Sequence, residues 1–269
     1  MVRVSVSSMF LWDLDPEGMA DVIAEAGLEE IEFWAETPWY WEGGRREEQA
    51  EEINRELEGR IMTLHAPVMD LNPSSYNDLV CQATIAESLR AIDLAEFLGA
   101  EVVTIHPGKR TAKRPAREAE LLKLRRYLGA CLDRAEERGI LLALENLEPA
   151  PWSICAEPEE MSRFLDELPL GMTLDISHAT PPMSRAIAFV DILKDRILNV
   201  HVSATRNGIR HLPPSDGSVD PVLEALRDAG YDGPLTLELD DKKFPKTLSR
   251  EDKVRVLRGE RRHLESVWF

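Results

Sequence analysis

Histidine and acidic side chains recur in this sequence at the ends of short apolar runs, where a metal ion or a proton-transfer reaction could use them. The residues are His65, His106, Glu145, Asp175, His178, His201 and Glu238, together with His211 shortly after His201. Five of the six histidines belong to this set, and His263 near the C-terminus is the exception. So regular a placement is not expected by chance, and it predicts a metal centre.

The mixture of ligand types narrows the choice of metal. Imidazole nitrogen and carboxylate oxygen together suit Zn²⁺ or Mn²⁺ better than Ca²⁺, which prefers oxygen ligands alone. We therefore expect a divalent metal cofactor, Zn²⁺ or Mn²⁺. The sequence leaves open whether one, two or three ions are bound.

Eight short apolar runs alternate with longer amphipathic segments. The runs occupy residues 2–9, 29–36, 61–67, 101–108, 140–147, 171–179, 197–204 and 234–239. Between them apolar residues recur at i, i+3, i+4 and i+7, which predicts helices. Repeated strand–helix units predict a parallel sheet covered by helices, and eight units in 269 residues favour a (β/α)8 TIM barrel as a single domain, 1–269.

This fold explains why the chemically useful residues follow the apolar runs. In a TIM barrel the C-terminal ends of the strands form the active site. The histidines and acids named above would then meet at one face, although they are far apart in the chain. An open doubly wound sheet is disfavoured, because no glycine-rich GxGxxG segment follows the first run.

Charge and cysteine content restrict the partners and the compartment. With 49 acidic and 32 basic residues the net charge is −17, which disfavours nonspecific binding to nucleic acid or to an anionic membrane. No apolar run approaches the roughly 18 residues of a membrane span. The three cysteines show no CxxC spacing, so a reducing, cytoplasmic location is the expectation.

Several motifs resemble the xylose isomerase-like TIM-barrel superfamily. They read LHAP, LGAEVVTIHPG, LEN, TLDISHA, NVHVS and IRHLPPSDGSVD, and they extend over most of the chain. That superfamily contains sugar and sugar phosphate isomerases and epimerases, and also the endonuclease IV class of DNA-repair enzymes. The resemblance is specific for the superfamily and leaves the substrate open.

The resemblance to the isomerases and epimerases implies one metal ion held by Glu145, Asp175, His201 and Glu238. In those enzymes the two glutamates also act as an acid–base pair, exchanging a proton next to the sugar carbonyl through a metal-stabilised enediolate. His178 would bind substrate hydroxyls. The implied function is a divalent-metal-dependent isomerase or epimerase of a sugar or sugar phosphate.

The resemblance to endonuclease IV implies an alternative, a zinc phosphodiesterase acting at abasic DNA sites. Eight of that enzyme's nine ligand positions match, with His65, His106, His178 and His211 added to the set of four. The ninth position is Ile209, which cannot bind a metal, and Ala204 replaces a usual aspartate. These losses and the acidic charge favour the isomerase reading. A barrel that binds metal and ligand without turnover is a third reading.

Basic and aromatic residues near the expected site suggest substrate contacts. Lys109 and Arg110 belong to a basic loop after 101–108, and Arg206 lies in an acid-free stretch after 197–204. They could bind a phosphate group of the substrate, or form solvated charged loops. Trp34, in the segment WAETPWYW, could stack on a sugar ring, cover the barrel rim or form a subunit contact.

Overall fold

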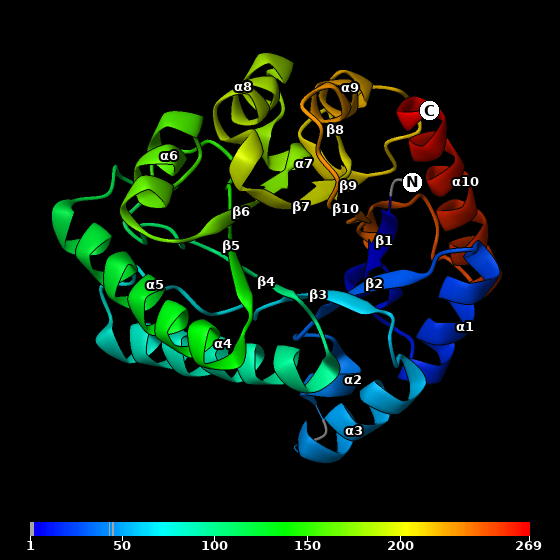
Figure 1. The fold of residues 1–269 in the computed structure, drawn as a ribbon, viewed down its shortest axis with the longest axis horizontal. Helices are drawn as coiled ribbons and strands as arrows, with labels where there is room; N and C mark the ends of the chain where they lie inside the picture. The colour runs from blue at the N-terminus through cyan, green and yellow to red at the C-terminus, as the bar shows by residue number, and fades with distance from the viewer. Residues whose placement is uncertain (1–2, 43, 45) are drawn as a thin grey trace.

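Eight strands pair in parallel and close into a barrel in a computed structural model that describes residues 3–42, 44 and 46–269. Around the barrel the order is β1-β10-β7-β6-β5-β4-β3-β2 (Figure 1). The strands are β1 (Arg3–Ser7), β2 (Glu30–Trp34), β3 (Ile61–His65), β4 (Val102–Ile105), β5 (Leu141–Glu145), β6 (Gly171–Asp175), β7 (Ile197–Val202) and β10 (Pro234–Leu237). The (β/α)8 TIM barrel expected from the sequence is confirmed.

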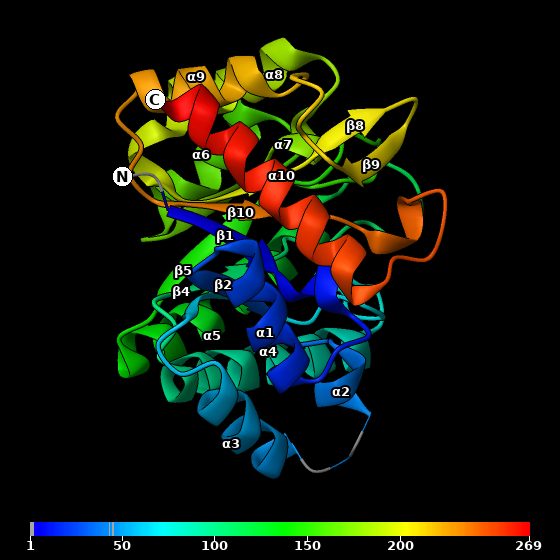
Figure 2. The ribbon, with the colours of Figure 1, turned by 90° about the vertical axis from the view of Figure 1, so that its right-hand side faces the viewer.

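Helices surround the barrel and cover its outer face (Figure 1). They are α1 (Pro16–Ala26), α2 (Pro38–Trp41), α3 (Arg46–Glu56), α4 (Asp78–Leu98), α5 (Glu118–Arg138), α6 (Pro158–Glu167), α7 (Ile176–Ala179), α8 (Met183–Leu193), α9 (Asp220–Asp228) and α10 (Arg250–Trp268). In Figure 2, α10 runs diagonally across the face turned toward the viewer, and it contacts α1. Among the described residues, no helix combines the length and apolar character needed to cross a membrane.

The barrel interior is polar in its middle. Thr104 on β4 bonds to Thr173 on β6, with 2.8 Å between the hydroxyl oxygens, and Asn199 on β7 donates to Glu32 on β2 at 2.8 Å. Neither pair comes from neighbouring strands, so both bonds cross the interior. Because side chains alternate between the two faces of a strand, the residue two positions further on shares the inner face. Thr173 and Asn199 are thus followed inside the barrel by Asp175 and His201.

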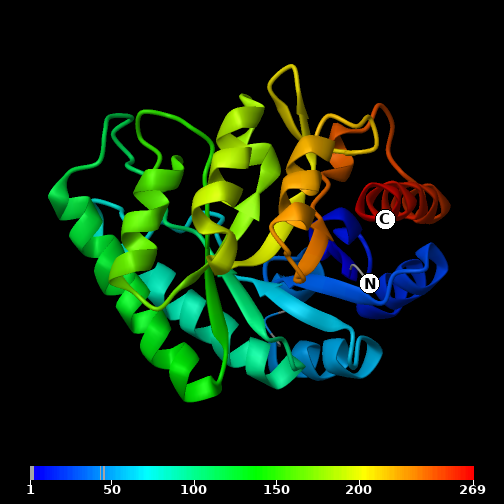
Figure 3. The same cartoon turned by 45° about the horizontal axis from the view of Figure 1, so that its top comes forward.

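Two features at the C-terminal end of the barrel differ from the sequence-based expectation. The run 171–179 is not one strand: β6 ends at Asp175, whose side chain accepts a hydrogen bond from the His178 backbone at 2.9 Å and caps α7. His178 therefore lies on a short helix. The chain after β7 also forms an unexpected hairpin of β8 (Ala204–Arg206) and β9 (Ile209–Leu212), which stands out above the barrel in Figure 3.

Gly108 marks a close contact between two loops at this end. The Asn72 side chain donates to Lys109 O at 2.6 Å and accepts from Lys109 N at 3.2 Å. Gly108 has φ +74°, and a Cβ atom there would meet Asn72 Oδ1 and lie 2.7 Å from Pro73 Cδ. Gly208, at the hairpin tip, has a similar φ of +77° but open space around it.

The difference in the space around Gly108 and Gly208 predicts that Gly108→Ala destabilises the protein more than Gly208→Ala. Both changes impose the strain of a left-handed residue, about 1–2 kcal/mol. Gly108→Ala adds overpacking, which costs about 1–3 kcal/mol more. Urea unfolding of both variants and the parent measures the difference. Equal losses of unfolding free energy in the two variants would contradict this prediction. They would mean that the loops carrying Asn72 and Gly108 move apart without a loss of stability.

Candidate metal centre

Four side chains converge at the C-terminal end of the barrel. Glu145 ends β5, Asp175 ends β6, His201 lies in β7, and Glu238 directly follows β10. One ligand atom from each lies within 4.8 Å of those of the other three. All four residues are buried, and Glu238, the most exposed, is 7 % exposed. The structure thus brings together the four residues named from the sequence.

Two further histidines approach Glu145 from one side. His65 Nε2 lies 3.2 Å from Glu145 Oε2, and His106 Nε2 lies 3.0 Å from the same oxygen. The ring of His65 also bonds to its neighbour's backbone, with 2.8 Å between Nδ1 and Ala66 O. These three side chains form a second group with the spacing of a metal site.

The remaining two histidines of the cluster lie beside Asp175 and Glu238. His178 Nδ1 is 3.3 Å from Asp175 Oδ2, and His211 Nδ1 is 3.3 Å from Glu238 Oε2. His178, His211 and Asp175 form a third group with metal-site spacing. His211 reaches the cluster from β9, so the hairpin that the sequence did not predict carries it there. By contrast, His263 pairs with Asp220 Oδ1 at 2.8 Å, away from the cluster.

The central group has the chemistry of a cation site. Asp175 Oδ2, His201 Nδ1 and Glu238 Oε2 are buried and, among the described residues, have no hydrogen-bond partner. An unsatisfied buried polar atom costs about 1–3 kcal/mol, so three in one group require an explanation. Lone pairs on carboxylate oxygens and an imidazole nitrogen match the ligands of a divalent transition metal. The residues therefore fit such an ion.

Asn146 holds one of these ligands in place and was not identified from the sequence. Its side chain accepts from Asp175 N at 2.8 Å and donates to Asp175 O at 3.0 Å. The amide thus joins the ends of β5 and β6 through two hydrogen bonds. Its backbone oxygen also lies 3.0 Å from His178 Nδ1. The motif LEN contains Asn146, but the bonding pattern depends on strands that pair only in the folded barrel.

Glu36 holds a loop that borders the site. It is 2 % exposed, and its two oxygens accept from Val68 N at 2.8 Å and Met69 N at 2.7 Å. Burial raises the pKa of Glu36, an effect that these two backbone hydrogen bonds oppose. The loop after β3 is therefore attached to the chain that follows β2.

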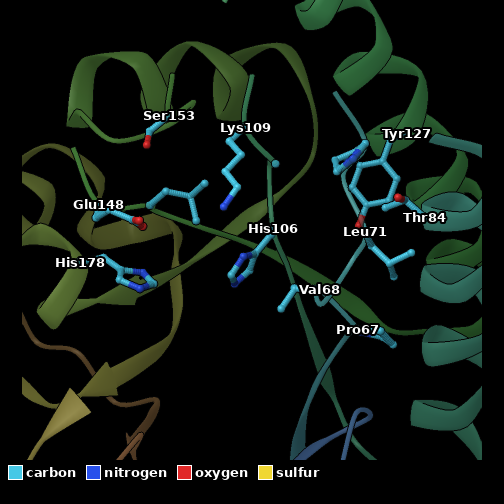
Figure 4. A pocket seen from close by; sticks show the side chains of 13 residues that line it. Pro67, Val68, Leu71, Thr84, His106, Lys109, Tyr127, Glu148, Ser153 and His178 are labelled. Carbon is cyan, nitrogen blue, oxygen red and sulfur yellow. The ribbon is translucent and has the colours of Figure 1, made fainter. Parts of the chain in front are cut away.

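A pocket opens beside the cluster, between the loops that follow β3, β4 and β5 (Figure 4). Its lining comprises Pro67, Val68, Leu71, Pro73, Thr84, His106, Gly108, Lys109, Tyr127, Leu147, Glu148, Ser153 and His178. Lys109 and His106 extend into the same space from the loop after β4, and Glu148 faces them beside His178. The walls thus combine an apolar side with donors and acceptors.

The three basic residues named from the sequence have different surroundings. Lys109 lines the pocket. The guanidinium of Arg110 is buried and bonds to Tyr76 and Pro115, with Glu120 Oε1 at 2.9 Å. Arg206 donates to Asp216 Oδ2 at 2.5 Å and to Pro213 O at 3.1 Å. Protein acceptors therefore already bind the guanidinium of Arg110 and Nη1 of Arg206.

Trp34 lies near His65 and does not belong to the residues that line the pocket. Its ring centroid is 6.2 Å from the His65 ring in an edge-on arrangement and 5.3 Å from that of Trp12. The Trp34 indole Nε1 is buried with no hydrogen-bond partner in the described part of the chain. The ring thus packs beside the cluster.

The buried carboxylates and imidazoles alter each other's pKa values. Burial opposes protonation of His65, but the hydrogen bond with Glu145 and the charges of Glu145 and Glu32 together outweigh this and raise the pKa to about 9. Burial likewise opposes protonation of His178, whose pKa Asp175 and Glu145 raise to about 10. Burial would raise the pKa of Glu145, but the neighbouring His106 and His201 hold it well below its usual range. Protonated imidazoles therefore balance the carboxylates in the metal-free protein.

Comparison with known proteins gives matches over most of the chain. A family model described as xylose isomerase-like TIM barrel matches residues 20–263. The uncharacterized protein MJ1188 of Methanocaldococcus jannaschii is 33 % identical over 99 % of this chain and 100 % of its own length. The ketose 3-epimerase of Arthrobacter globiformis is 27 % identical over 55 % of this chain and 53 % of its own.

A solved structure extends the likeness to three dimensions. A protein described as D-tagatose 3-epimerase-like superimposes with a TM-score of 0.77 at 27 % identity, covering 99 % of this chain and 98 % of that protein.

The pKa values of His65 and His178 predict that the metal-free protein loses stability as pH rises. Both folded-state pKa values, about 9 and about 10, exceed the ordinary histidine value of 6.5. The resulting stabilisation is complete below about pH 6.5 and disappears as pH rises through about 9 to 10. Urea unfolding of chelator-treated protein at a series of pH values measures the slope.

Two variants serve as a test and a control for this pH dependence of the unfolding free energy. His178→Gln should flatten the slope, because it removes one imidazole whose pKa is raised. His263→Gln, which alters the remote pair with Asp220, should leave it as in the parent. A parent protein whose stability does not change between pH 7 and pH 10 would contradict the charge balance described above.

Proposed function

The chain belongs to the xylose isomerase-like TIM-barrel family, and from this premise we propose that it is a divalent-metal-dependent sugar isomerase or epimerase. The family match confirms the resemblance drawn from the sequence motifs. The observation that carries the proposal is the buried group of Glu145, Asp175, His201 and Glu238. Two glutamates in one metal-binding group provide both a cation site and a pair of proton carriers.

The relatives support this class of reaction. The ketose 3-epimerase and the D-tagatose 3-epimerase-like protein are both named for changes at a carbon beside the carbonyl of a ketose. Such a change requires removal of a proton from that carbon and its return. The pocket beside the cluster, with its Lys109, Glu148 and Ser153 groups, suits the hydroxyls of a sugar.

The proposed roles follow from the surroundings of each side chain. A divalent cation held by the four residues would polarise the substrate carbonyl and ease removal of the adjacent proton. Glu145 and Glu238 are the proposed proton carriers, on strand ends separated by β6 and β7. His65 and His106 both approach Oε2 of Glu145. His178, Lys109 and Trp34 are the proposed substrate contacts.

Burial of the two glutamates serves this chemistry. Glu145 is 1 % exposed and Glu238 is 7 % exposed, so bulk water has little access to either carboxylate. The deprotonated substrate is then shielded from bulk water until one of the two carboxyl groups returns a proton to the carbon. A carboxylate positioned for such a transfer contributes about 10²–10⁴-fold to the rate.

A zinc phosphodiesterase acting at abasic DNA is the second candidate. The two additional groups, His65–His106–Glu145 and Asp175–His178–His211, favour it because they could hold further ions. Ile209 is exposed on the hairpin and supplies no ligand, and the net charge of −17 opposes DNA. The isomerase reading therefore remains the preferred one.

Replacing either glutamate tests the proposal. With an active ketose in D₂O, the parent enzyme is expected to introduce deuterium beside the carbonyl. Glu145→Gln and Glu238→Gln should lower kcat by about 10²–10⁴-fold, because each removes a proton carrier. Nuclear magnetic resonance of the sugar measures both the deuterium and the turnover, and elemental analysis measures the bound metal.

His263→Gln is the matched control and should retain the parent's rate, because it lies outside the cluster. The proposal fails if the metal-loaded parent turns over none of the ketoses, aldoses and their phosphates. Cleavage of an oligonucleotide with an abasic site, together with nearly three zinc ions per chain, would support the second candidate instead.

The basic residues give a separate prediction about substrate binding. Lys109→Ala should raise KM about tenfold or more, since a hydrogen bond to a charged group contributes about 1.5–3 kcal/mol. Arg110→Ala should leave KM nearly unchanged and lower the urea midpoint, because its guanidinium binds Tyr76 and Glu120. Steady-state kinetics with neutral and phosphorylated sugars measures both variants. A larger effect of Lys109→Ala on phosphorylated substrates would identify phosphate recognition, whereas an unchanged KM would remove Lys109 from the proposed contacts.

A further inference from the structure

Glu32 is a buried acid that has no part in the proposed reaction. It lies in the middle of β2 and is 0 % exposed, with its carboxylate inside the barrel. Its Oε2 accepts from Thr63 Oγ1 on β3 at 3.0 Å and from Asn199 Nδ2 on β7 at 2.8 Å. Glu32 is absent from the lining of the pocket beside the cluster. Any influence of Glu32 on the site is therefore exerted through another residue.

That residue is His201. Its Nε2 lies 3.0 Å from Oε1 and 3.2 Å from Oε2 of Glu32. An ionised carboxylate can only accept hydrogen bonds, so the ring must carry a hydrogen on Nε2. In the neutral ring this leaves a lone pair on Nδ1. That nitrogen faces the cluster, 3.4 Å from Glu238 Oε2 and 3.7 Å from Glu145 Oε2.

We propose that Glu32 is a positioning residue of the metal centre, which holds His201 in the Nε2–H tautomer and presents Nδ1 to the ion. The inference rests on the proposed function in one respect, since it treats His201 as a metal ligand. A carboxylate behind a metal-bound histidine fixes the tautomer and orientation of the ring and increases its basicity as a ligand.

The position of His201 among the cluster histidines supports this role. In His65, the ring nitrogen that does not face Glu145 is Nδ1, and it lies 2.8 Å from a backbone oxygen, that of Ala66. Within the described chain, His201 is the one cluster histidine backed by a carboxylate from outside the cluster. It is also 0 % exposed, so water does not provide an alternative partner.

A purely structural link between strands would not need a charge. Thr104 and Thr173 join β4 and β6 across the same interior with two neutral hydroxyls. An ionised carboxylate without water is far more costly to bury than a hydroxyl unless opposite charge and donors compensate it. Two neutral donors and the His201 ring surround Glu32, and a cation on the far side of that ring would add the opposite charge. The charge of Glu32 is thus explained by the ligand that it supports.

Glu32→Gln tests the inference, because it preserves shape and removes the negative charge. The probe is Co²⁺ alone, whose visible absorption reports the ligands directly in a titration of metal-free protein. The variant is expected to bind Co²⁺ about 10–100-fold more weakly than the parent, as is typical when a partner behind a ligand is lost. Thr104→Val is the matched control: it removes an interior hydrogen bond away from Glu32 and should bind Co²⁺ like the parent.

The outcomes separate this inference from the proposed function. A parent protein that binds no Co²⁺ would overturn both. If the parent binds Co²⁺ and Glu32→Gln binds it within twofold of the parent, the inference alone is overturned. Equal weakening in Glu32→Gln and Thr104→Val would also overturn it, since any loss of an interior hydrogen bond would then have the same effect.

A second measurement applies even if Glu32→Gln does not fold. In the zinc-loaded parent protein, long-range ¹H–¹⁵N correlation spectra report which nitrogen of each histidine carries hydrogen. His201, assigned by its absence in His201→Gln, is expected to carry hydrogen on Nε2. Hydrogen on Nδ1 would overturn the inference, because that nitrogen could not then bind the ion.

Discussion

The open end of the barrel is organised around one buried carboxylate, that of Glu145. Its oxygens lie 3.0–3.7 Å from nitrogens of four histidines that come from β3, the loop after β4, α7 and β7, namely His65, His106, His178 and His201. A charge buried this deeply is costly unless opposite charge lies close by. The surrounding imidazoles provide that charge when protonated, and a divalent cation would provide it when they are neutral. Charge balance at Glu145 therefore links the positions of the surrounding strands and loops to the chemistry of the site.

Hydrogen bonds between side chains and the backbone hold the strand ends and loops around this cluster in place. Asn146 pairs with the Asp175 backbone, Glu36 holds the loop after β3, and Asn72 joins that loop to Lys109. Glu32 extends the same network below the cluster, to Thr63 and Asn199. Catalytic groups gain most when their geometry is set before the substrate arrives. Strand ends joined in these ways meet that requirement better than mobile loops would.

The distribution of charge around the pocket bears on its ligand. Although the loops near the site are rich in lysine and arginine, Arg110 and Arg206 bond to acids and carbonyl groups of the protein itself. Lys109 lines the pocket, and Glu148 lines it too. A wall with one cation and one anion suits hydroxyl groups, which both donate and accept, more readily than a group of like charges would.

Barrel architecture, and the meeting of Glu145, Asp175, His201 and Glu238 at one end of it, were predictable from the sequence. Strands alternate with helices throughout, and the ends of parallel strands meet at one edge, so residues such as His106 and Glu145 had to lie close together. The individual contacts between side-chain atoms depend on the tertiary structure alone. Glu32 and His201 are separated by 169 positions, and only barrel closure makes β2 and β7 face each other. The partners of Arg110 likewise depend on the conformation of the loop after β4. The periodicity of apolar residues in the sequence carries no information about that conformation.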